Sequence, residues 1–397
     1  MMSVWSSLVG QDAAVAKLGE AAASARAIVA SRGGARAFDD ARSMSHAWLI
    51  TGPPGSGRSV AARAFAAALQ CTGETVGCGQ CAGCRTTMGR TNADVVFAAT
   101  ETSIINVETA RSLVLQAQSS PSQGLWRVIV VEDADRLGES GANALLKAIE
   151  EPPEHTVWLL CAPSPEDMIA TIRSRCRHLG LRIPTASAVA DLLVREGVAT
   201  PDVALEAARA AQSHIGLARA LARDPQMRER RRAIITAPAS VRSVGEAVMA
   251  ADRLLETAKA QADAQVSERN AREKAELMRQ LGMDEGESAT KASRTMIRQL
   301  EEDQKRRSKR ALTDAIDRAL IDLLAIYRDV LMVQVGGDGE LINTDLSDLV
   351  HEIAQDSAPR QTLARVDHIE TARKRLVSNG NPLLVLEDMA ISLRPQA

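Results

Sequence analysis

The feature that most constrains the fold is the stretch 52–59, Gly-Pro-Pro-Gly-Ser-Gly-Arg-Ser, between a short apolar run at 46–51 and an alanine-rich stretch at 60–70. The apolar run predicts a buried strand, and the alanine-rich stretch predicts a helix. The pattern Gly-x-x-x-x-Gly-Lys-Ser/Thr is that of a phosphate loop, and only its lysine is replaced here. We therefore expect a strand, a phosphate-loop turn and a helix in this order.

The following residues repeat the alternation of strand and helix. Apolar runs at 128–131 and 156–161 predict two more buried strands, and residues 143–153 between them have a helical pattern. This alternation predicts a parallel sheet with helices on both faces. Aromatic residues make up only 2% of the chain, which favours helix packing over a β-sandwich. We interpret residues 25–45 as a surface insertion before the first strand.

The pattern changes beyond Pro184. Apolar residues recur at helical spacing in 187–195, 202–211 and 215–222, which predicts a small all-helical domain. The chain stays helical from about residue 227. One apolar stripe in this region comprises Leu312, Ile316, Leu320, Leu323, Leu324 and Tyr327. The 397 residues are expected to form two or three domains, α/β first and all-α afterwards.

Charge is concentrated in residues 258–310, where 23 of 53 residues are charged. Such a segment cannot bury a core of its own, so we predict a protruding charged helical hairpin, partly disordered around 283–292. We interpret the basic run 305–310 as a solvated helix face. The whole chain has a net charge of -2, which excludes a global basic field for nucleic acid.

Four cysteines, Cys71, Cys78, Cys81 and Cys84, lie within 14 residues and among glycines that permit tight turns. The N-terminus has no cationic head before an apolar run, and no membrane span is expected, so we predict a cytoplasmic protein with no membrane partner. In a reducing compartment this spacing indicates a structural Zn²⁺ held by four thiolates. Four free thiols on a loop are the alternative, and Cys161 is expected to be a small core residue.

The phosphate loop differs from the standard pattern at its cation. The glycines Gly52, Gly55 and Gly57 let the backbone curl so that N–H groups point at an anion, and Ser59 occupies the position of the Mg²⁺-binding hydroxyl. Arg58 replaces the lysine, and its wide planar guanidinium does not reproduce the geometry of a compact ammonium. Binding of ATP or ADP with Mg²⁺ is therefore left open, and a plain glycine-proline turn is the alternative.

The strand at 128–131 ends in Glu132 and Asp133. In phosphate-loop enzymes an Asp at this strand end usually orders the Mg²⁺ shell, and a neighbouring Glu commonly positions water. Here the order is inverted, which displaces each carboxylate. A misplacement of about 1 Å can cost roughly 100-fold in rate. An acidic strand end that faces solvent is the alternative.

In their order along the chain, these motifs resemble the bacterial DNA polymerase III clamp-loader family of AAA+ proteins, and its delta-prime branch in particular. The residues that carry the resemblance are VGQ at 9–11, HAWLITGPPGSGRS at 46–59, the cysteine insert at 71–84, VIVVEDADRL at 128–137, NALLKAIEEPP at 143–153, TIRSRC at 171–176 and LVSNGNPLLVLEDM at 376–389.

The resemblance implies a RecA-like AAA+ domain with a parallel sheet at 1–182, a three-helix lid at 183–226 and a helical oligomerisation collar at 227–397. Family members form a five-subunit ring that opens the sliding clamp and places it on primed DNA. The implied partners are thus the delta and gamma/tau subunits in a hetero-pentameric ring, the sliding clamp, and primed DNA through the assembled complex.

The resemblance also implies roles for single residues. Catalytic subunits of the family keep the lysine and an Asp-Glu pair, so Arg58 with Glu132 and Asp133 implies a largely non-hydrolysing stator. Arg175 matches the arginine of Ser-Arg-Cys that reaches the γ-phosphate of ATP on the neighbouring subunit, an arginine finger in trans. A surface arginine is the alternative for Arg175.

Two other functions remain as hypotheses. An active AAA+ ATPase of the gamma/tau type would have to tolerate Arg58. A free-standing zinc-dependent DNA-binding module is disfavoured by the net charge and by the lack of interleaved aromatic and basic residues. Ser164 and Arg219 are loose matches to the sensor positions of the family, and we assign them no role.

Overall fold

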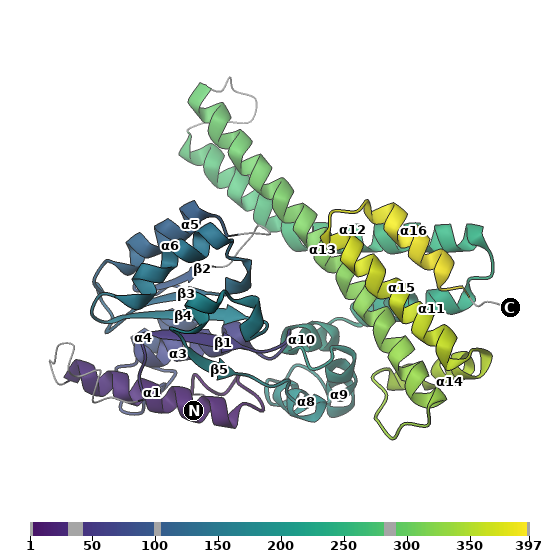
Figure 1. The fold of residues 1–397 in the computed structure, drawn as a ribbon, viewed down its shortest axis with the longest axis horizontal. Helices are drawn as coiled ribbons and strands as arrows, with labels where there is room; N and C mark the ends of the chain where they lie inside the picture. The colour runs from purple at the N-terminus through teal and green to yellow at the C-terminus, as the bar shows by residue number, and fades with distance from the viewer. Residues whose placement is uncertain (1–2, 31–42, 99–104, 282–290, 395–397) are drawn as a thin grey trace. The chain divides into compact units, whose positions relative to one another are not determined.

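The computed structural model describes residues 3–30, 43–98, 105–281 and 291–394, and the chain divides into two compact units, Met1–Ala222 and Arg223–Ala397 (Figure 1). The first unit contains a parallel sheet covered by helices, and the described part of the second is helical. The predicted fold class, α/β followed by helices, is confirmed.

The first unit is built on a five-stranded parallel sheet with the strand order β2-β3-β4-β1-β5. The strands are β1 (Ala47–Thr51), β2 (Val95–Ala98), β3 (Arg127–Val131), β4 (Thr156–Ala162) and β5 (Arg177–Gly180). The three central strands are those that the sequence predicted. The two edge strands, β2 and β5, were not predicted, because each has only four residues and neither is buried throughout.

Alternate residues of the central strands pack into two separate cores. Trp48 and Ile50 of β1 face one core, and Leu49 faces the other. The first core is closed by α1 (Asp12–Ala30), α3 (Arg58–Leu69) and α4 (Ala82–Met88). The second is closed by α5 (Val107–Ala117), α6 (Glu139–Glu150) and α7 (Ala170–Arg173). Burial on both faces explains the continuous apolar runs of these strands.

The interpretation of residues 25–45 as a surface insertion is wrong for its first part. Residues 25–30 are the last turns of α1, and Ala25 and Ile28 are buried in the first core. They continue the helical spacing of buried residues that begins at Ala14, so the helix buries one apolar face along its whole length. Residues 31–42 lie outside the described residues.

Three short helices complete the first unit. They are α8 (Ala186–Arg195), α9 (Pro201–Ala210) and α10 (Ile215–Arg223), each within one residue of its predicted range. The Thr185 hydroxyl caps α8 by accepting a hydrogen bond from the Ala188 N–H at 3.2 Å. The predicted boundaries of a lid and a collar stay predictions.

The second unit packs its helices around the predicted apolar stripe. Its helices are α11 (Pro225–Ser240), α12 (Val244–Gln280), α13 (Lys291–Gln334), α14 (Ser347–Asp356), α15 (Pro359–Val377) and α16 (Pro382–Ser392). Within the stripe, Ile316, Leu320, Leu323 and Tyr327 of α13 are buried, while Leu312 and Leu324 are partly buried. The stripe is therefore confirmed as the centre of this core.

A buried polar network lies beside this core. The Arg231 guanidinium contacts Asp322 at 3.0 Å and donates to Asn343 Oδ1 at 2.6 Å. Asn343 in turn donates to Asp329 Oδ2 at 2.9 Å. Burial raises the pKa of Asp322, and the charge of Arg231 opposes this effect. Because each charge in the network has a partner, the network is compatible with burial.

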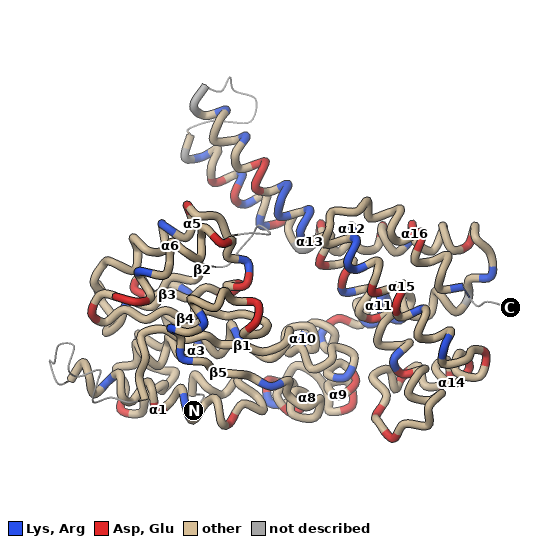
Figure 2. The backbone as a smooth tube through the Cα atoms, in the orientation of Figure 1, with Lys and Arg blue, Asp and Glu red and all other residues tan. Residues whose placement is uncertain are grey.

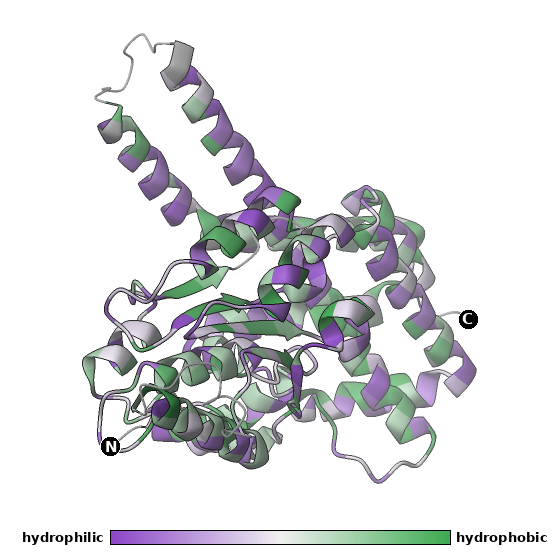
Figure 3. Cartoon of the chain, turned by 60° about the vertical axis from the view of Figure 1, so that its left-hand side comes forward, coloured by the Kyte–Doolittle hydropathy of each residue, from purple (hydrophilic) through white to green (hydrophobic). Residues whose placement is uncertain are grey.

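The far parts of α12 and α13 form the predicted charged hairpin, which extends away from the rest of its own unit (Figures 1 and 2). Its two helices are largely hydrophilic (Figure 3). They are joined by ion pairs of Arg307 with Glu273 at 2.8 Å and of Lys274 with Glu301 at 3.3 Å. The predicted disorder around 283–292 falls mainly on residues 282–290, outside the described residues. Within the described ranges, no helix is long and apolar enough to cross a membrane.

Candidate functional site

The phosphate loop follows β1 and turns directly into α3. Gly55 and Gly57 both have φ 89°, a left-handed conformation that glycine adopts without strain. A Cβ atom on Gly55 would lie 3.0 Å from the Cα of His214, at the turn before α10. The first N–H groups of α3 have no acceptor within the helix, so the loop has the backbone form of an anion cradle.

Gln11, the residue before α1, supports this loop through hydrogen bonds. Its Nε2 donates to the Ser56 carbonyl at 3.3 Å and to the Arg182 carbonyl at 2.5 Å, and its Oε1 accepts from the Arg182 N–H at 3.2 Å. The Gln11 side chain is buried. Gln11 thus ties the phosphate loop to the segment that follows β5. Sequence reasoning quoted it only as part of the Val-Gly-Gln motif and gave it no structural role.

Arg58 is the first residue of α3, and its Nη1 donates to the carbonyl oxygen of Gly52. The guanidinium therefore folds back onto the loop that begins at Gly52. Ser59 is half-buried next to it. The Ser56 hydroxyl is buried and has no hydrogen-bond partner among the described residues. The predicted phosphate-loop residues thus come together. The Ser56 hydroxyl is left without a hydrogen-bond partner among the described residues, and Arg58 is hydrogen-bonded to the loop backbone.

Glu132 is the first residue after β3, and its N–H donates to the Ala98 carbonyl at 3.0 Å. Its side chain is 13% exposed, and Oε1 lies 2.5 Å from Nη2 of Arg90. Sequence reasoning missed Arg90, because an isolated arginine in a loop carries no recognisable pattern. The ion pair means that this carboxylate already has a cationic partner within the chain.

Asp133 follows Glu132 and directly precedes the short helix η1 (Ala134–Arg136), without capping it through its side chain. The pKa of the neighbouring Asp135 reflects the charges around this turn. Burial raises the pKa of Asp135, and Asp133 raises it further, whereas the charge of Arg58 lowers it. The arginine of the phosphate loop and the acidic end of β3 therefore share one electrostatic environment.

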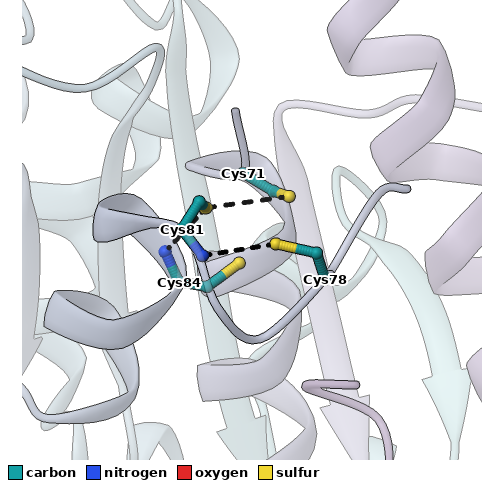
Figure 4. A group of neighbouring side chains, drawn as sticks. All are labelled: Cys71, Cys78, Cys81 and Cys84. Atoms are coloured by element: carbon teal, nitrogen blue, oxygen red, sulfur yellow. Dashed lines mark hydrogen bonds between the residues drawn. The ribbon is translucent and has the colours of Figure 1, made fainter. Parts of the chain in front are cut away.

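The four cysteines of the insert converge, as Figure 4 shows. Their Sγ atoms all lie within 4.8 Å of one another. Four thiolates at about 2.3 Å from one tetrahedral ion would be separated by about 3.8 Å, so a small contraction would suffice. Cys71 and Cys84 are buried, and Cys78 and Cys81 are half-buried. The cluster could therefore hold a metal ion with four sulfur ligands.

Local backbone geometry brings these sulfurs together. Cys81 caps α4, since its Sγ accepts from the Cys84 N–H at 3.4 Å, and Cys78 Sγ accepts from the Cys81 N–H at 3.4 Å. A Cβ on Gly83 would lie 2.0 Å from the Gln70 carbonyl oxygen, so only glycine allows α4 to meet the end of α3. Burial raises the pKa of Cys81, but hydrogen bonds from the backbone at Cys84 and elsewhere in the loop outweigh it and lower the pKa to about 6.

The two other cysteines lie outside the cluster. Cys161 is fully buried in β4, which confirms the predicted core role. Burial raises the pKa of Cys161 and that of Cys176 to about 12. Both are therefore neutral thiols at neutral pH.

Arg175 follows α7 at the surface, with 39% of its side chain exposed. Its Nε forms an ion pair with Glu150 at the end of α6, and its Nη1 donates to the Thr171 carbonyl at 2.8 Å. Arg219 of α10 forms a bidentate pair with Glu196, both contacts at 2.9 Å. Ser164 caps the short helix η2 (Pro165–Asp167). All of these contacts are made with residues outside the phosphate loop.

A parallel sheet whose first strand ends in a glycine-rich cradle at a helix N-terminus defines a phosphate-loop protein of the α/β class. Residues 37–185 match the family described as "DNA polymerase III, delta subunit". The chain is also similar to the DNA polymerase III subunit gamma/tau of Mycobacterium tuberculosis (strain ATCC 25618 / H37Rv), with 35% identity over 170 residues. That alignment covers 41% of this chain and 29% of the relative.

Two relatives are named DNA polymerase III subunit delta'. The one from Pseudomonas aeruginosa is 34% identical over 167 residues, 41% of this chain and 50% of the relative. The one from Escherichia coli (strain K12) is 34% identical over 180 residues, 44% of this chain and 54% of the relative. The chain therefore spans about half the length of these delta' relatives and less of the gamma/tau one. Over the matched residues, the chain is thus similar to the delta, delta' and gamma/tau subunits of DNA polymerase III.

Proposed function

We propose that this chain is a delta-prime-type subunit of a DNA polymerase III clamp loader, a stator with little or no ATP hydrolysis of its own. The observation that carries the proposal is that two side chains needed at a hydrolytic site are engaged elsewhere. Arg58 contacts the Gly52 carbonyl, and Glu132 is paired with Arg90. Neither is positioned to bind the phosphate or to activate water without first giving up its present partner.

Nucleotide binding fits the loop better than hydrolysis does. The curled backbone around Gly55 and Gly57 and the unpartnered Ser56 hydroxyl suit the phosphates of ATP or ADP. The Ser59 hydroxyl would hold Mg²⁺, which neutralises phosphate charge when bound. Arg58 would contribute a positive charge in a different geometry from that of the usual lysine. We therefore propose binding without fast turnover.

We propose that the cysteine cluster holds a structural Zn²⁺. Four sulfur donors that converge from one loop and the start of α4 match the closed four-cysteine type, which leaves no position for a reacting water. The bound metal would fix the path of residues 71–84 between α3 and β2. This role requires no catalytic step at the metal.

In the assembled complex, Arg175 would act in trans. Its side chain is exposed, and its contacts with Glu150 and Thr171 are at the surface, so they can be exchanged at small cost. The proposed partners are the delta and gamma/tau subunits of a hetero-pentameric ring, with the sliding clamp and primed DNA bound by the assembly. The proposed site of action is the cytoplasm.

The second candidate is a hydrolysing subunit of the gamma/tau type. The 35% identity with a gamma/tau relative and the intact backbone of the phosphate loop favour it. Measurement of ATP turnover by the purified chain separates the two candidates. We expect turnover at background, with and without clamp and primed DNA. Robust turnover that Ser59→Ala abolishes would instead establish the second candidate.

Reconstituted rings test the arginine finger. A finger can be worth about 10³ to 10⁵ in rate, so Arg175→Ala should nearly abolish hydrolysis at the one partner site that it faces and impair clamp loading. Arg175→Lys should rescue poorly, because an ammonium lacks the planar fork. Arg173→Ala is the matched control, since Arg173 is also exposed and lies two residues away. Wild-type rates for Arg175→Ala in fully assembled rings would refute the finger.

A further inference from the structure

Arg90 occupies an unusual backbone position directly after the cysteine loop. Helix α4 ends at Met88, Gly89 follows, and Arg90 has φ 59°, in the left-handed region. Its N–H donates to the Thr87 carbonyl at 3.0 Å, and the Thr91 N–H donates to the Thr86 carbonyl at 2.8 Å. Residues other than glycine adopt this conformation rarely, and here these two hydrogen bonds close the end of the helix around Arg90.

The side chain of Arg90 makes two further contacts, one on β2 and one at the end of β3. Its guanidinium carbon lies 5.0 Å from the centroid of the Phe97 ring on β2, a cation–π arrangement. Its Nη2 lies 2.5 Å from Glu132 Oε1 at the end of β3. One side chain therefore joins the end of α4 to two neighbouring strands, on the side where the acidic pair leaves the sheet.

A second arginine also interacts electrostatically with Glu132 and with Arg90. Arg63 lies on α3, is half-buried, and its Nε has no hydrogen-bond partner among the described residues. Burial lowers the pKa of Arg63, the charge of Arg90 lowers it further, and the charge of Glu132 opposes both. Glu132 is thus the counter-charge for two guanidinium groups, so its release would leave both arginines without this carboxylate.

The position of Arg90 depends in turn on the cysteine cluster. Cys81 caps α4, which carries Cys84 one turn before Thr87; both residues are buried, and Cys84 is part of the first core. The helix has only seven residues, which is too short to be stable without tertiary support. The sulfur cluster at its start and the buried Cys84 and Thr87 therefore together support the turn that carries Arg90.

We propose that Arg90 is a positioning residue for Glu132 and that its own position depends on whether metal is bound to the cysteine cluster. With metal bound, α4 holds Arg90 on Glu132, and this ion pair keeps the carboxylate out of the phosphate-loop site. Loss of the metal loosens α4 and frees Glu132. The inference rests on the proposed function in that it assumes a metal at the cluster. Under this proposal, the cysteine cluster stabilises its own loop and also controls the contacts of Glu132 at the end of β3.

Hydrogen–deuterium exchange of the nucleotide-free full chain tests this coupling. Wild-type protein is compared with its metal bound and after removal of the metal by a chelator. After removal of the metal, exchange should rise in residues 71–91. It should also rise by about three- to fivefold in residues 130–137, as expected for the loss of an ion pair of ordinary strength. Arg90→Gln should show the same rise in residues 130–137 with metal still bound, and chelation should add nothing there.

Two further variants make the result decisive. Arg85→Gln removes the same charge from an exposed position on α4 and should behave like wild type. Glu132→Gln should bind the metal about three- to fivefold more weakly than wild type, as should Arg90→Gln, because the coupling free energy between two sites is reciprocal. Metal content and metal affinity are measured by equilibrium competition with a colorimetric chelator.

Unchanged exchange in residues 130–137 after chelation, with a rise confined to residues 71–91, would overturn the coupling. Wild-type protein purified without metal would overturn it as well. Metal affinity equal to that of wild type in both Arg90→Gln and Glu132→Gln would overturn the coupling too. ATP turnover by the unmodified chain would overturn the stator proposal alone, because none of these measurements involves nucleotide.

Discussion

The two loops at the ends of α3 use glycine in the same way but differ in what their polar side chains face. At the helix start, Gly55 and Gly57 shape a cradle, while Arg58 contacts the Gly52 carbonyl. At the helix end, Gly83 permits a close approach, and four sulfurs face one another. The backbone of both loops is suited to a ligand, but only the second loop presents a complete set of ligand side chains.

This difference shows that a binding loop and its chemistry can be separated. The phosphate loop is held by its own surroundings, through Gln11 and through the packing of His214 against Gly55. Its backbone can therefore persist although its cation and its carboxylate make other contacts. The cysteine loop packs on the first core through Val76, Cys78 and Cys81, so two of its ligand side chains are themselves part of the packing, and its ligand and its structure depend on each other.

The largest effect is expected at the cysteine loop. Cys81→Ser should lose stoichiometric metal and destabilise the first unit by about 3–5 kcal/mol, because the free energy of binding a structural metal is also folding free energy. Metal content and denaturant unfolding measure this. Cys176→Ser, outside the cluster, should keep its metal. Full metal content in Cys81→Ser would show that this loop is not a metal site.

A smaller effect is expected at Asp94, which shapes the chain beside the end of α3. This buried carboxylate accepts from the N–H groups of Ser122, Gln123 and Gly124 at 2.6–2.7 Å. Asp94→Ala would leave these donors without their acceptor and should cost about 2–3 kcal/mol. The exposed Asp191→Ala should stay within about 0.5 kcal/mol in the same denaturant unfolding.

The contribution of Asp94 should depend on pH. Burial raises the pKa of Asp94, but the backbone hydrogen bonds of residues 122–124 outweigh it and lower the pKa. A lowered folded-state pKa stabilises the fold above the unfolded value of about 3.9, and the stabilisation is lost as the pH falls through the folded value. Wild-type and Asp94→Ala stabilities should therefore converge in acid. A constant difference down to pH 2 would contradict this.

The support of the phosphate loop should contribute less. Gln11→Ala removes two donated hydrogen bonds and one accepted hydrogen bond from a buried position, and we expect a loss of about 1–2 kcal/mol in unfolding free energy. Gln116→Ala, at an exposed position on α5, is the matched control. Equal thermal unfolding temperatures for the two variants would mean that the loop holds its shape without Gln11.

The smallest effect is expected from Arg58→Lys. It restores the usual cation, but Glu132 stays paired with Arg90, so ATP turnover should remain at background while nucleotide affinity changes by less than about tenfold. Steady-state turnover and fluorescent nucleotide titration measure the two quantities. Fast turnover by this single variant would mean that the acidic end of β3 is already competent and that only the cation separates this site from an active one.

Local sequence patterns predicted the parts of the fold that are locally encoded. The continuous apolar runs located β1, β3 and β4, and the apolar stripe of α13 marked the second core. The edge strands β2 and β5 were missed, because their strand structure depends on pairing with a neighbour more than on their own residues. The end of α1 was misread, because alanine, glycine and serine near residue 30 resemble a surface loop in composition.

For the candidate sites, the sequence alone determined which residue types stand at which spacing: three glycines and Ser59 in one loop, four cysteines in another, and Glu132 at a strand end. Only the tertiary structure decided which of these groups face a partner. Arg90 and Glu132 are 42 residues apart, and Gln11 and Arg182 are 171 apart. Such contacts have no signature in local periodicity, because the packing of distant helices and strands, rather than the spacing along the chain, places the two side chains within hydrogen-bonding distance.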